Sequence, residues 1–256
     1  MNNKKVTIVT TTINSPTLAT LKFAEIASSR PNFNFVICGD TNTPHDEYRA
    51  LEVKYGFHNV IYLDPADQDR LYPKISKILG WKTIERRNIG FLYAYDNGAD
   101  VLATVDDDNI PYHYWGDKIF VGEEIEFDEW CSTDSDYFDP LAVTNTPHLW
   151  HRGYPIEHLQ TRHNVKSLGV NKKKCLIQAM LWNGDPDVDA ICRITFKPDV
   201  IYNITKPYGS FQKSPFNSQN TFIAREAIPY YAMLPGLGRM DDIWASYIFE
   251  HYFPNR

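Results

Sequence analysis

The 256-residue sequence lacks the features that define several large classes of protein. Its four cysteines form no close pair, so we expect neither a disulfide framework nor a zinc site and predict reduced thiols. No apolar run approaches the ~20 residues that span a bilayer, and the threonine-rich stretch after the basic N-terminus is too polar for a signal-peptide core. We therefore expect a cytoplasmic chain without a transmembrane segment.

The charge and the missing motifs exclude further functions. The formal net charge of −6 argues against a nucleic-acid binder, which would present a basic face. There is no P-loop, no Gly-x-Ser-x-Gly elbow and no His-Glu-x-x-His motif, which excludes kinase-like, serine-hydrolase and zincin sites. What the chain does have is aromatic residues, 14% of the total, which are common both where flat rings or sugars are bound and in thick cores.

The first half of the sequence alternates between strand and helix patterns. The predicted strands are Lys5–Thr12, Phe35–Cys38, Asn59–Leu63 and Val101–Val105, and the predicted helices are Thr17–Ser29 and Thr83–Asn97. We expect Ser15 to cap the first helix, with Pro16 at its first position. This alternation indicates an α/β fold, with a mostly parallel sheet flanked by helices.

The patterns beyond residue 110 are weaker. We predict an irregular excursion over 112–139, strands at 141–145 and 192–197, and helices at 171–182 and 241–253. The chain shows no linker and no internal repeat, so we predict a single domain over 1–256, with a more regular half at about 1–110 and an irregular half at about 111–256.

Polar side chains follow three of the predicted strands at the point where each strand ends. They are Thr11 and Thr12, Asp40, and Asp106-Asp107-Asp108. Open parallel sheets bind ligands beyond the carboxyl ends of their strands, so we expect these side chains to meet at one edge and form a site.

The three acidic residues after the strand at 101–105 are the strongest candidates for chemistry. In an extended chain Asp106 and Asp108 point the same way, and two carboxylates ~7 Å apart repel each other unless a cation or protons intervene. Hard divalent ions such as Mg²⁺ or Mn²⁺ prefer such oxygen ligands together with substrate phosphates. The alternative is a solvated acidic turn, which we favour less because the acids directly follow a buried strand.

Other candidate residues each have a structural alternative. Asp185 and Asp187 lie in a segment that resembles a calcium loop but lacks its glycine and glutamate, which leaves an Asx turn or a wall of an active site. Asp241 and Asp242 are helix caps or, alternatively, a general base or a contact to an acceptor hydroxyl. His251 is either a hydrogen-bonded side chain or a further metal ligand.

Basic residues provide candidate anion contacts. Arg86 and Arg87, followed by Asn88, stand at a helix start, where positive charge is unfavourable unless a phosphate or the acidic cluster compensates it; a solvated charged face is the alternative. Arg152 lies in a tight aromatic turn and is a candidate contact to phosphate or carboxylate.

Several blocks in this order resemble a known family. An acidic triplet at the end of a strand resembles the Asp-x-Asp motif of GT-A-fold glycosyltransferases, and the wider pattern is similar to the plant STELLO-type glycosyltransferases. The similar blocks are Arg86–Ala94, Asn97–Ala99, Asp106–Asp108, Trp150–Pro155, Gln178 with Asn183–Asp189, and Pro215–Thr221. The reversibly glycosylated polypeptides, which are nucleotide-sugar mutases, share the acidic triplet and a turn like Arg152–Pro155.

The resemblance implies a GT-A-like, Rossmann-like fold with a nucleotide-binding first half and an acceptor-side second half. It implies a metal-dependent glycosyltransferase that moves a sugar from a nucleoside diphosphate sugar, first of all a UDP-sugar, to a glycan or another hydroxyl acceptor. The alternatives are a nucleotide-sugar pyranose/furanose mutase and an inactive sugar-nucleotide-binding protein. The implied cofactor is Mn²⁺ or Mg²⁺.

The predicted site residues fall into three groups. Catalytic candidates are Asp187, Asp241 and Asp242. Substrate-binding candidates are Thr11, Thr12, Asp40, Arg87, Asn88, Arg152, Asp185 and Asn217, and metal-ligand candidates are Asp106, Asp108 and His251.

Overall fold

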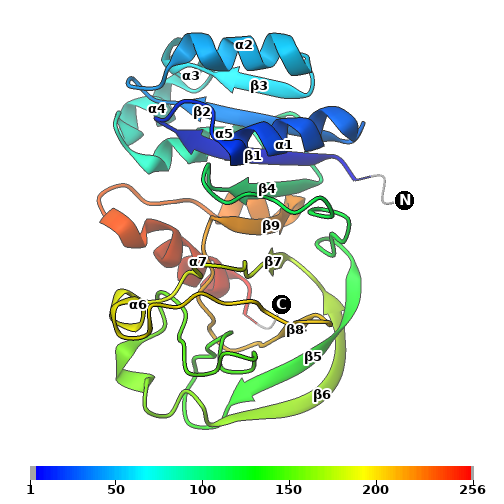
Figure 1. The fold of residues 1–256 in the computed structure, drawn as a ribbon, viewed down its shortest axis with the longest axis vertical. Helices are drawn as coiled ribbons and strands as arrows, with labels where there is room; N and C mark the ends of the chain where they lie inside the picture. Colours follow the sequence, from blue (N-terminus) through cyan, green and yellow to red (C-terminus); the bar gives the residue numbers. More distant parts are fainter. Residues whose placement is uncertain (1–3, 255–256) are drawn as a thin grey trace.

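The computed structural model describes residues 4–254 as a mixed α/β fold built on a six-stranded sheet (Figure 1). Its strands are β1 (Val6–Thr12), β2 (Phe33–Gly39), β3 (Val60–Leu63), β4 (Val101–Val105), β7 (Ile177–Ala179) and β9 (Asn220–Ala224). They lie in the order β3-β2-β1-β4-β9-β7. The first four strands are parallel, and β9 runs antiparallel to both β4 and β7. The expected mainly parallel sheet flanked by helices is confirmed and is consistent with a GT-A-like fold.

Helices cover both faces of this sheet. They are α1 (Leu18–Ser29), α2 (His45–Tyr55), α3 (Pro65–Leu71), α4 (Pro73–Leu79) and α5 (Arg87–Asp96), with the short 3₁₀ helix η1 (Ile84–Arg86) leading into α5. The chain passes from β1 through α1 to β2 and through α2 to β3, and then returns through α5 to β4 on the other side of β1. Because such crossovers are right-handed, α1 and α2 cover one face and α5 covers the other.

The first helix is capped by a different residue from the one expected. Thr17 is the N-cap, and its hydroxyl accepts a hydrogen bond from the Thr20 amide at 3.1 Å. The predicted cap, Ser15, donates instead to Glu47 on α2 at 3.2 Å, so that prediction was wrong. Two residues with capping side chains precede this helix, and the one nearer the first buried turn makes the cap.

Close packing of α5 on β1 depends on a glycine. A Cβ atom at Gly90 would lie 2.4 Å from Cγ1 of Val9, closer than atoms can approach. Ile89 and Phe91 on either side are buried in the same core. The helix therefore lies directly on the central strands, which fixes Arg87 at its start beside the carboxyl end of β4.

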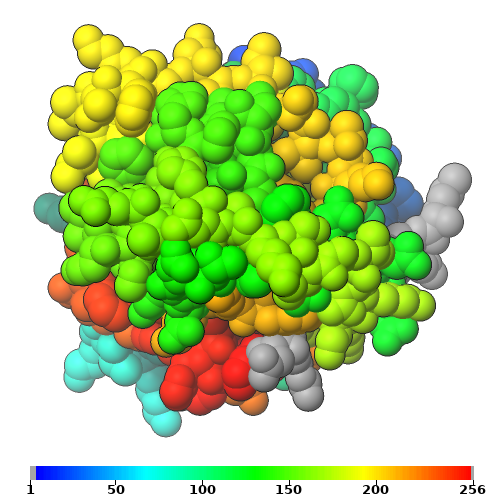
Figure 2. Space-filling model, turned by 90° about the horizontal axis from the view of Figure 1, so that it is seen from below, coloured from blue at the N-terminus to red at the C-terminus, as the bar shows by residue number. Residues whose placement is uncertain are grey.

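The second half of the chain adds a smaller sheet and its own small core. Its strands are β5 (Glu124–Ser132), β6 (Val165–Lys174) and β8 (Tyr208–Gly209), in the order β6-β5-β8. The remaining elements are α6 (Ala190–Phe196), α7 (Asp241–Tyr252) and the 3₁₀ helices η2 (Ile156–His158), η3 (Arg225–Tyr230) and η4 (Gly238–Met240). Seen from below, this half forms most of the visible face (Figure 2).

Several predictions for this half were wrong. The excursion at 112–139 contains β5, the helix predicted at 171–182 is the end of β6 followed by β7, and the strand predicted at 141–145 is a turn. The lysines at the end of β6 pair across the ladder with acidic residues of β5, as in Glu126 opposite Lys172, which favours the strand. The residues predicted as a strand at 192–197 form the last part of α6 and its C-cap, and Asp189 caps the other end of this helix by accepting from the Ile191 amide.

The helix predicted at 241–253 is confirmed as α7. None of the helices within residues 4–254 combines the length and apolar character needed to cross a bilayer.

Candidate functional site

The expected meeting of strand ends is present in the fold. Strands β2, β1 and β4 are parallel neighbours, so Asp40, Thr12 and Asp106 leave the sheet at the same edge. The strand order reverses direction between β1 and β4, and a crevice at such a switch point is where open sheets bind ligands. The acidic triplet therefore stands at the position where this fold class binds its ligands.

The three carboxylates of the triplet have different surroundings. Asp107 accepts hydrogen bonds from the Thr12 hydroxyl and, at 3.0 Å, from the Asn14 amide, which ties it to the end of β1. Asp106 accepts from Nη2 of Arg87 at 2.6 Å. Asp108 is exposed and makes no ion pair within residues 4–254, and partial burial together with the charges of Asp106 and Asp107 raises its pKa. Two acids are thus held by hydrogen bonds, whereas the negative charge of the third is disfavoured by its neighbours.

Asp106 and Asp108 are the residues of this cluster that could hold a divalent cation. The free oxygen of Asp106 and the carboxylate of Asp108 are hard oxygen ligands of the kind that Mg²⁺ and Mn²⁺ prefer. Within residues 4–254, no three histidine, cysteine, aspartate or glutamate side chains are grouped to hold a metal. A cation here would therefore need further oxygens from a ligand, as phosphates supply.

Arg87 compensates the acidic cluster rather than facing solvent. It is 1% exposed, and besides the Asp106 pair its Nη1 donates to the hydroxyl of Ser218 at 2.8 Å and to the Ser218 carbonyl at 3.1 Å. Burial alone would lower its pKa, but the charge of Asp106 raises it above the ordinary value. Arg86 has a structural role, because its guanidinium binds Gln68 and lies 3.6 Å from the ring centre of Trp81.

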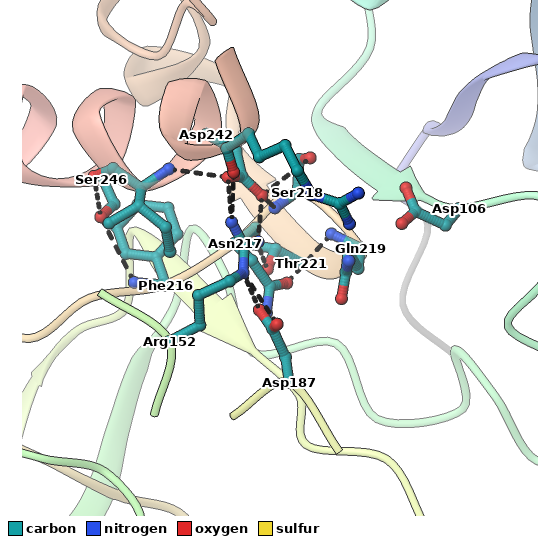
Figure 3. Close-up of polar contacts among 12 residues, drawn as sticks. Asp106, Arg152, Asp187, Phe216, Asn217, Ser218, Gln219, Thr221, Asp242 and Ser246 are labelled. Atoms are coloured by element: carbon teal, nitrogen blue, oxygen red, sulfur yellow. Dashed lines mark hydrogen bonds and ion pairs between the residues drawn. The ribbon is translucent and has the colours of Figure 1, made fainter. Parts of the chain in front are cut away.

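Arg152 joins two acids from separate parts of the chain (Figure 3). Its Nη1 and Nη2 donate to the two oxygens of Asp242 at 3.0 and 2.8 Å, and its Nε lies 2.8 and 2.9 Å from those of Asp187. All three side chains are largely buried. Burial would raise the pKa of Asp242, but the hydrogen bonds from Arg152 lower it, so this carboxylate stays ionised.

A turn at residues 215–221 connects these charged groups. The side-chain amide of Asn217 donates to Asp187 at 2.7 Å, and the backbone amide of Ser218 donates to Asp242 at 3.1 Å. The carbonyl of Gln219 accepts from the Asp106 amide at 3.2 Å. The 215–221 turn thus lies between the acidic triplet and the Arg152 ion pairs, as Figure 3 shows.

The result is one continuous chain of polar contacts. It runs through Asp106, Arg87, Ser218, Asp242, Arg152, Asp187 and Asn217. Sequence reasoning named six of these seven residues. It missed Ser218, and with it strand β9 that follows, although the polar run before the apolar Thr221–Ala224 was a usable signal.

Other predicted residues have local partners. Thr11 donates to the Cys38 carbonyl at 2.9 Å, and Asp40 accepts from the backbone amides of Lys82 and Thr83 at 2.7 and 3.1 Å, which holds the loop before α5. The side-chain amide of Asn88 exchanges two hydrogen bonds with the backbone of Met233.

Two predicted residues lie at the surface, and a buried acid, Asp241, has one oxygen, Oδ2, without a hydrogen-bond partner within residues 4–254. Asp185 forms an exposed ion pair with Arg193. His251 is exposed near the end of α7, about 13 Å along the helix axis from Asp242, and is not brought together with Asp106 and Asp108. Asp241 is buried, and burial and the adjacent Asp242 raise its pKa to about 6.

A cavity of about 1130 Å³ adjoins this network. Asp108 and Asn109 line it beside the triplet, and Asp187, Asn217 and Gln219 line it beside the Arg152 ion pairs. Much of the remaining wall is aromatic, with contributions from Tyr112, Trp115, Phe138, Trp182, Tyr208 and Phe216. Ligand pockets commonly enclose about 300–1,000 Å³, so this cavity has room for a sugar and a second molecule.

Comparison with curated proteins gives a similarity to a glycosyltransferase. No protein-family model matches the sequence. The chain is 25% identical over 217 residues to a protein of Arabidopsis thaliana named "Probable glycosyltransferase STELLO2". The aligned region covers 77% of this chain and 27% of that protein. The chain thus spans about a quarter of the length of the curated relative it matches. This similarity supports a family relationship between the chain and the STELLO-type glycosyltransferases.

Proposed function

We propose that this protein is a metal-dependent glycosyltransferase that takes a sugar from a nucleoside diphosphate sugar, a UDP-sugar first, and transfers it to a hydroxyl acceptor. The observation that carries this proposal is the pair Asp106 and Asp108 at the β1/β4 switch point, beside a large cavity, where the buried Arg87 pairs with Asp106. The similarity to a protein named a glycosyltransferase supports the same class of reaction.

The reaction places specific demands on this edge of the sheet. An acceptor oxygen bonds to the anomeric carbon, the bond from that carbon to the terminal phosphate oxygen breaks, and the hydroxyl proton passes to a base. A divalent cation held by Asp106 and Asp108 would stabilise the charge that develops on the departing diphosphate. Arg87 holds Asp106 in place from the buried side and so fixes one of the two ligands.

The acidic candidates divide into different roles. Asp242 accepts from Arg152, from Ser218 and from the Ile243 amide, so its geometry favours positioning the 215–221 turn over removing a proton. Asp187 lines the cavity, so it is the predicted catalytic acid best placed to meet an acceptor hydroxyl. Thr11, Thr12 and Asp40 are assigned to the nucleotide by family resemblance, and their place at the same edge of the sheet supports this.

Calorimetry tests the proposal directly. Nucleoside diphosphates, beginning with UDP, are titrated into the protein with and without Mn²⁺, and we expect binding that depends on the metal. Replacing both Asp106 and Asp108 by asparagine should weaken this binding at least ~100-fold, because the replacement removes both carboxylate ligands of the proposed cation. Asp107→Asn is the matched control, because Asp107 is tied to Thr12 and Asn14, and it should bind UDP nearly normally.

Two outcomes would point to the alternatives. Conversion of UDP-arabinopyranose to the ring-contracted sugar nucleotide without an acceptor would identify a mutase. Metal-dependent binding without transfer or hydrolysis, across donors and acceptors, would identify an inactive sugar-nucleotide-binding protein. No metal-dependent nucleotide binding at all would contradict the proposal.

A further inference from the structure

Two side-chain amides in the cavity wall each have one buried atom without a hydrogen-bond partner within the described part of the chain. Nδ2 of Asn109 and Oε1 of Gln219 are buried and have no partner within residues 4–254. Other amides near the cavity are satisfied: Gln178, for example, accepts from the Phe120 amide at 2.8 Å and donates to the Lys118 carbonyl at 3.0 Å. A buried polar group without a partner costs about 1–3 kcal/mol, so this pair calls for an explanation.

Both amides belong to residues that lie next to the acidic triplet. Asn109 directly follows Asp108, and the carbonyl of Gln219 accepts from the Asp106 amide at 3.2 Å. Figure 3 places the Gln219 side chain next to Asp106. Both residues line the cavity. A ligand in this cavity whose phosphates approach Asp106 and Asp108 would therefore have these two amides within the wall beside it.

The missing partners define the chemistry of that group. The side-chain nitrogen Nδ2 of Asn109 lacks an acceptor, and the side-chain oxygen Oε1 of Gln219 lacks a donor. A hydroxyl group supplies both, since it donates one hydrogen bond and accepts others. In a nucleoside diphosphate sugar, the group bonded to the terminal phosphate is a sugar that carries several hydroxyls.

We propose that Asn109 and Gln219 bind hydroxyl groups of the donor's sugar and thereby determine which sugar nucleotide the protein accepts. This inference rests on the proposed function, because it takes the diphosphate to lie at Asp106 and Asp108.

The test compares a nucleotide with its sugar derivative. Calorimetry in the presence of Mn²⁺ measures the Kd of UDP, UDP-glucose, UDP-galactose and UDP-xylose for the wild type and for Gln219→Met and Asn109→Ala. For the sugar nucleotide that the wild type binds best, we expect each variant to weaken binding about 5- to 10-fold, while the Kd of UDP changes less than 2-fold. Melting temperatures should stay level or rise, because each variant removes an unsatisfied polar group.

Gln178→Met is the matched control, since it removes an amide from the same cavity that is already hydrogen-bonded. It should lower the melting temperature and leave the ratio of the two Kd values unchanged. The inference is overturned if the variants weaken UDP and the UDP-sugar equally, if they leave sugar binding unchanged, or if Gln178→Met has the same effect. If the wild type binds no nucleotide with Mn²⁺, the proposed function fails and the inference fails with it.

Discussion

Nη2 of Arg87 lies 2.6 Å from Oδ1 of Asp106, and this ion pair joins the first residue of α5 to the residue that follows β4. The side chain of Arg87 is 2% exposed, whereas that of Asp106 is 19% exposed. The pair is therefore anchored on its arginine side and open on its carboxylate side, which leaves the second oxygen of Asp106 accessible.

Removing this arginine should cost stability. Arg87→Met leaves Asp106 without its counter-charge and Ser218 without its donor, and we expect the free energy of unfolding to fall by about 2–4 kcal/mol in urea titrations. Lys22→Met is the control, because Lys22 pairs with Glu25 at 2.8 Å at the surface, where such pairs contribute little to stability. Equal losses for the two variants would show that the burial of Arg87 adds nothing.

The ion pairs of Arg152 lead to a second prediction. Arg152→Ala leaves Asp187 and Asp242 buried and uncompensated, and should lower the free energy of unfolding by about 3–5 kcal/mol. Arg152→Lys should recover only part of this, because an ammonium group cannot bind two carboxylates through a planar fork. Full recovery by lysine would contradict the geometry described for this site.

The stability that Arg152 contributes should depend on pH through the ionisation of Asp242. Arg152 lowers the pKa of Asp242 below its ordinary value of about 3.9, so the stabilisation is present above that pH and is lost as the pH falls through the lower folded-state value. The cost of Arg152→Ala should therefore be smaller in urea titrations at pH 3 than at pH 7. A cost that does not change with pH would exclude this linkage.

The strands of the first half follow from local sequence patterns, whereas those of the second half do not. Val101–Val105 is an apolar run followed by acids, so both the buried strand and the polar edge could be predicted from neighbouring residues. Strand β6 has no alternating apolar pattern and exposes Leu168 and Val170. It forms because its lysines meet the acids of β5, which belong to a distant segment.

The same distinction applies to the candidate site. Asp106 and Asp108 were predictable because the strand that carries them was predictable. The contacts between Arg87 and Ser218 and between Arg152 and Asp242 join residues 131 and 90 positions apart. No local pattern reports such pairs, so sequence reasoning could name Arg87, Arg152 and Asp242 as candidates but could not show that one turn connects them.

Asp241 gives a prediction of the opposite sign from Asp242. It is buried with one oxygen unpartnered within residues 4–254, and its pKa is raised to about 6. Between about pH 4 and 6 the folded state binds more protons than the unfolded state, so the free energy of unfolding falls as the pH rises through this range.

Asp241→Asn should remove this fall in the free energy of unfolding, because asparagine does not ionise. In urea titrations we expect the variant to be more stable than the wild type by about 1–2 kcal/mol at pH 8, with the difference vanishing near pH 4. Asp242→Asn is the control next to it, and should be less stable than the wild type at pH 8 because it weakens the bonds from Arg152. If Asp241→Asn is also destabilising at pH 8, the buried carboxylate of Asp241 has a partner that it needs.

Gly153 connects the Arg152 turn to α7 by close contact. Its φ is +88°, and a Cβ atom there would lie 2.3 Å from Cγ2 of Ile243, one residue beyond Asp242. Gly153→Ala should therefore lower the free energy of unfolding by about 2–4 kcal/mol, through backbone strain and through the displacement of α7. Gly122→Ala is the control, since Gly122 has a φ of +84° with no atom within 4 Å, and it should cost only about 1 kcal/mol.

The contact with Ile243 can be separated from the strain by a double-mutant cycle. Ile243→Ala alone should lower the free energy of unfolding, because its side chain is buried. Combined with Gly153→Ala it should cost less than the sum of the two single changes, by about 1–2 kcal/mol, since the shortened side chain leaves room for the new methyl group. Costs that simply add would mean that α7 does not rest on the Arg152 turn, and that the position of Asp242 is set by its ion pair alone.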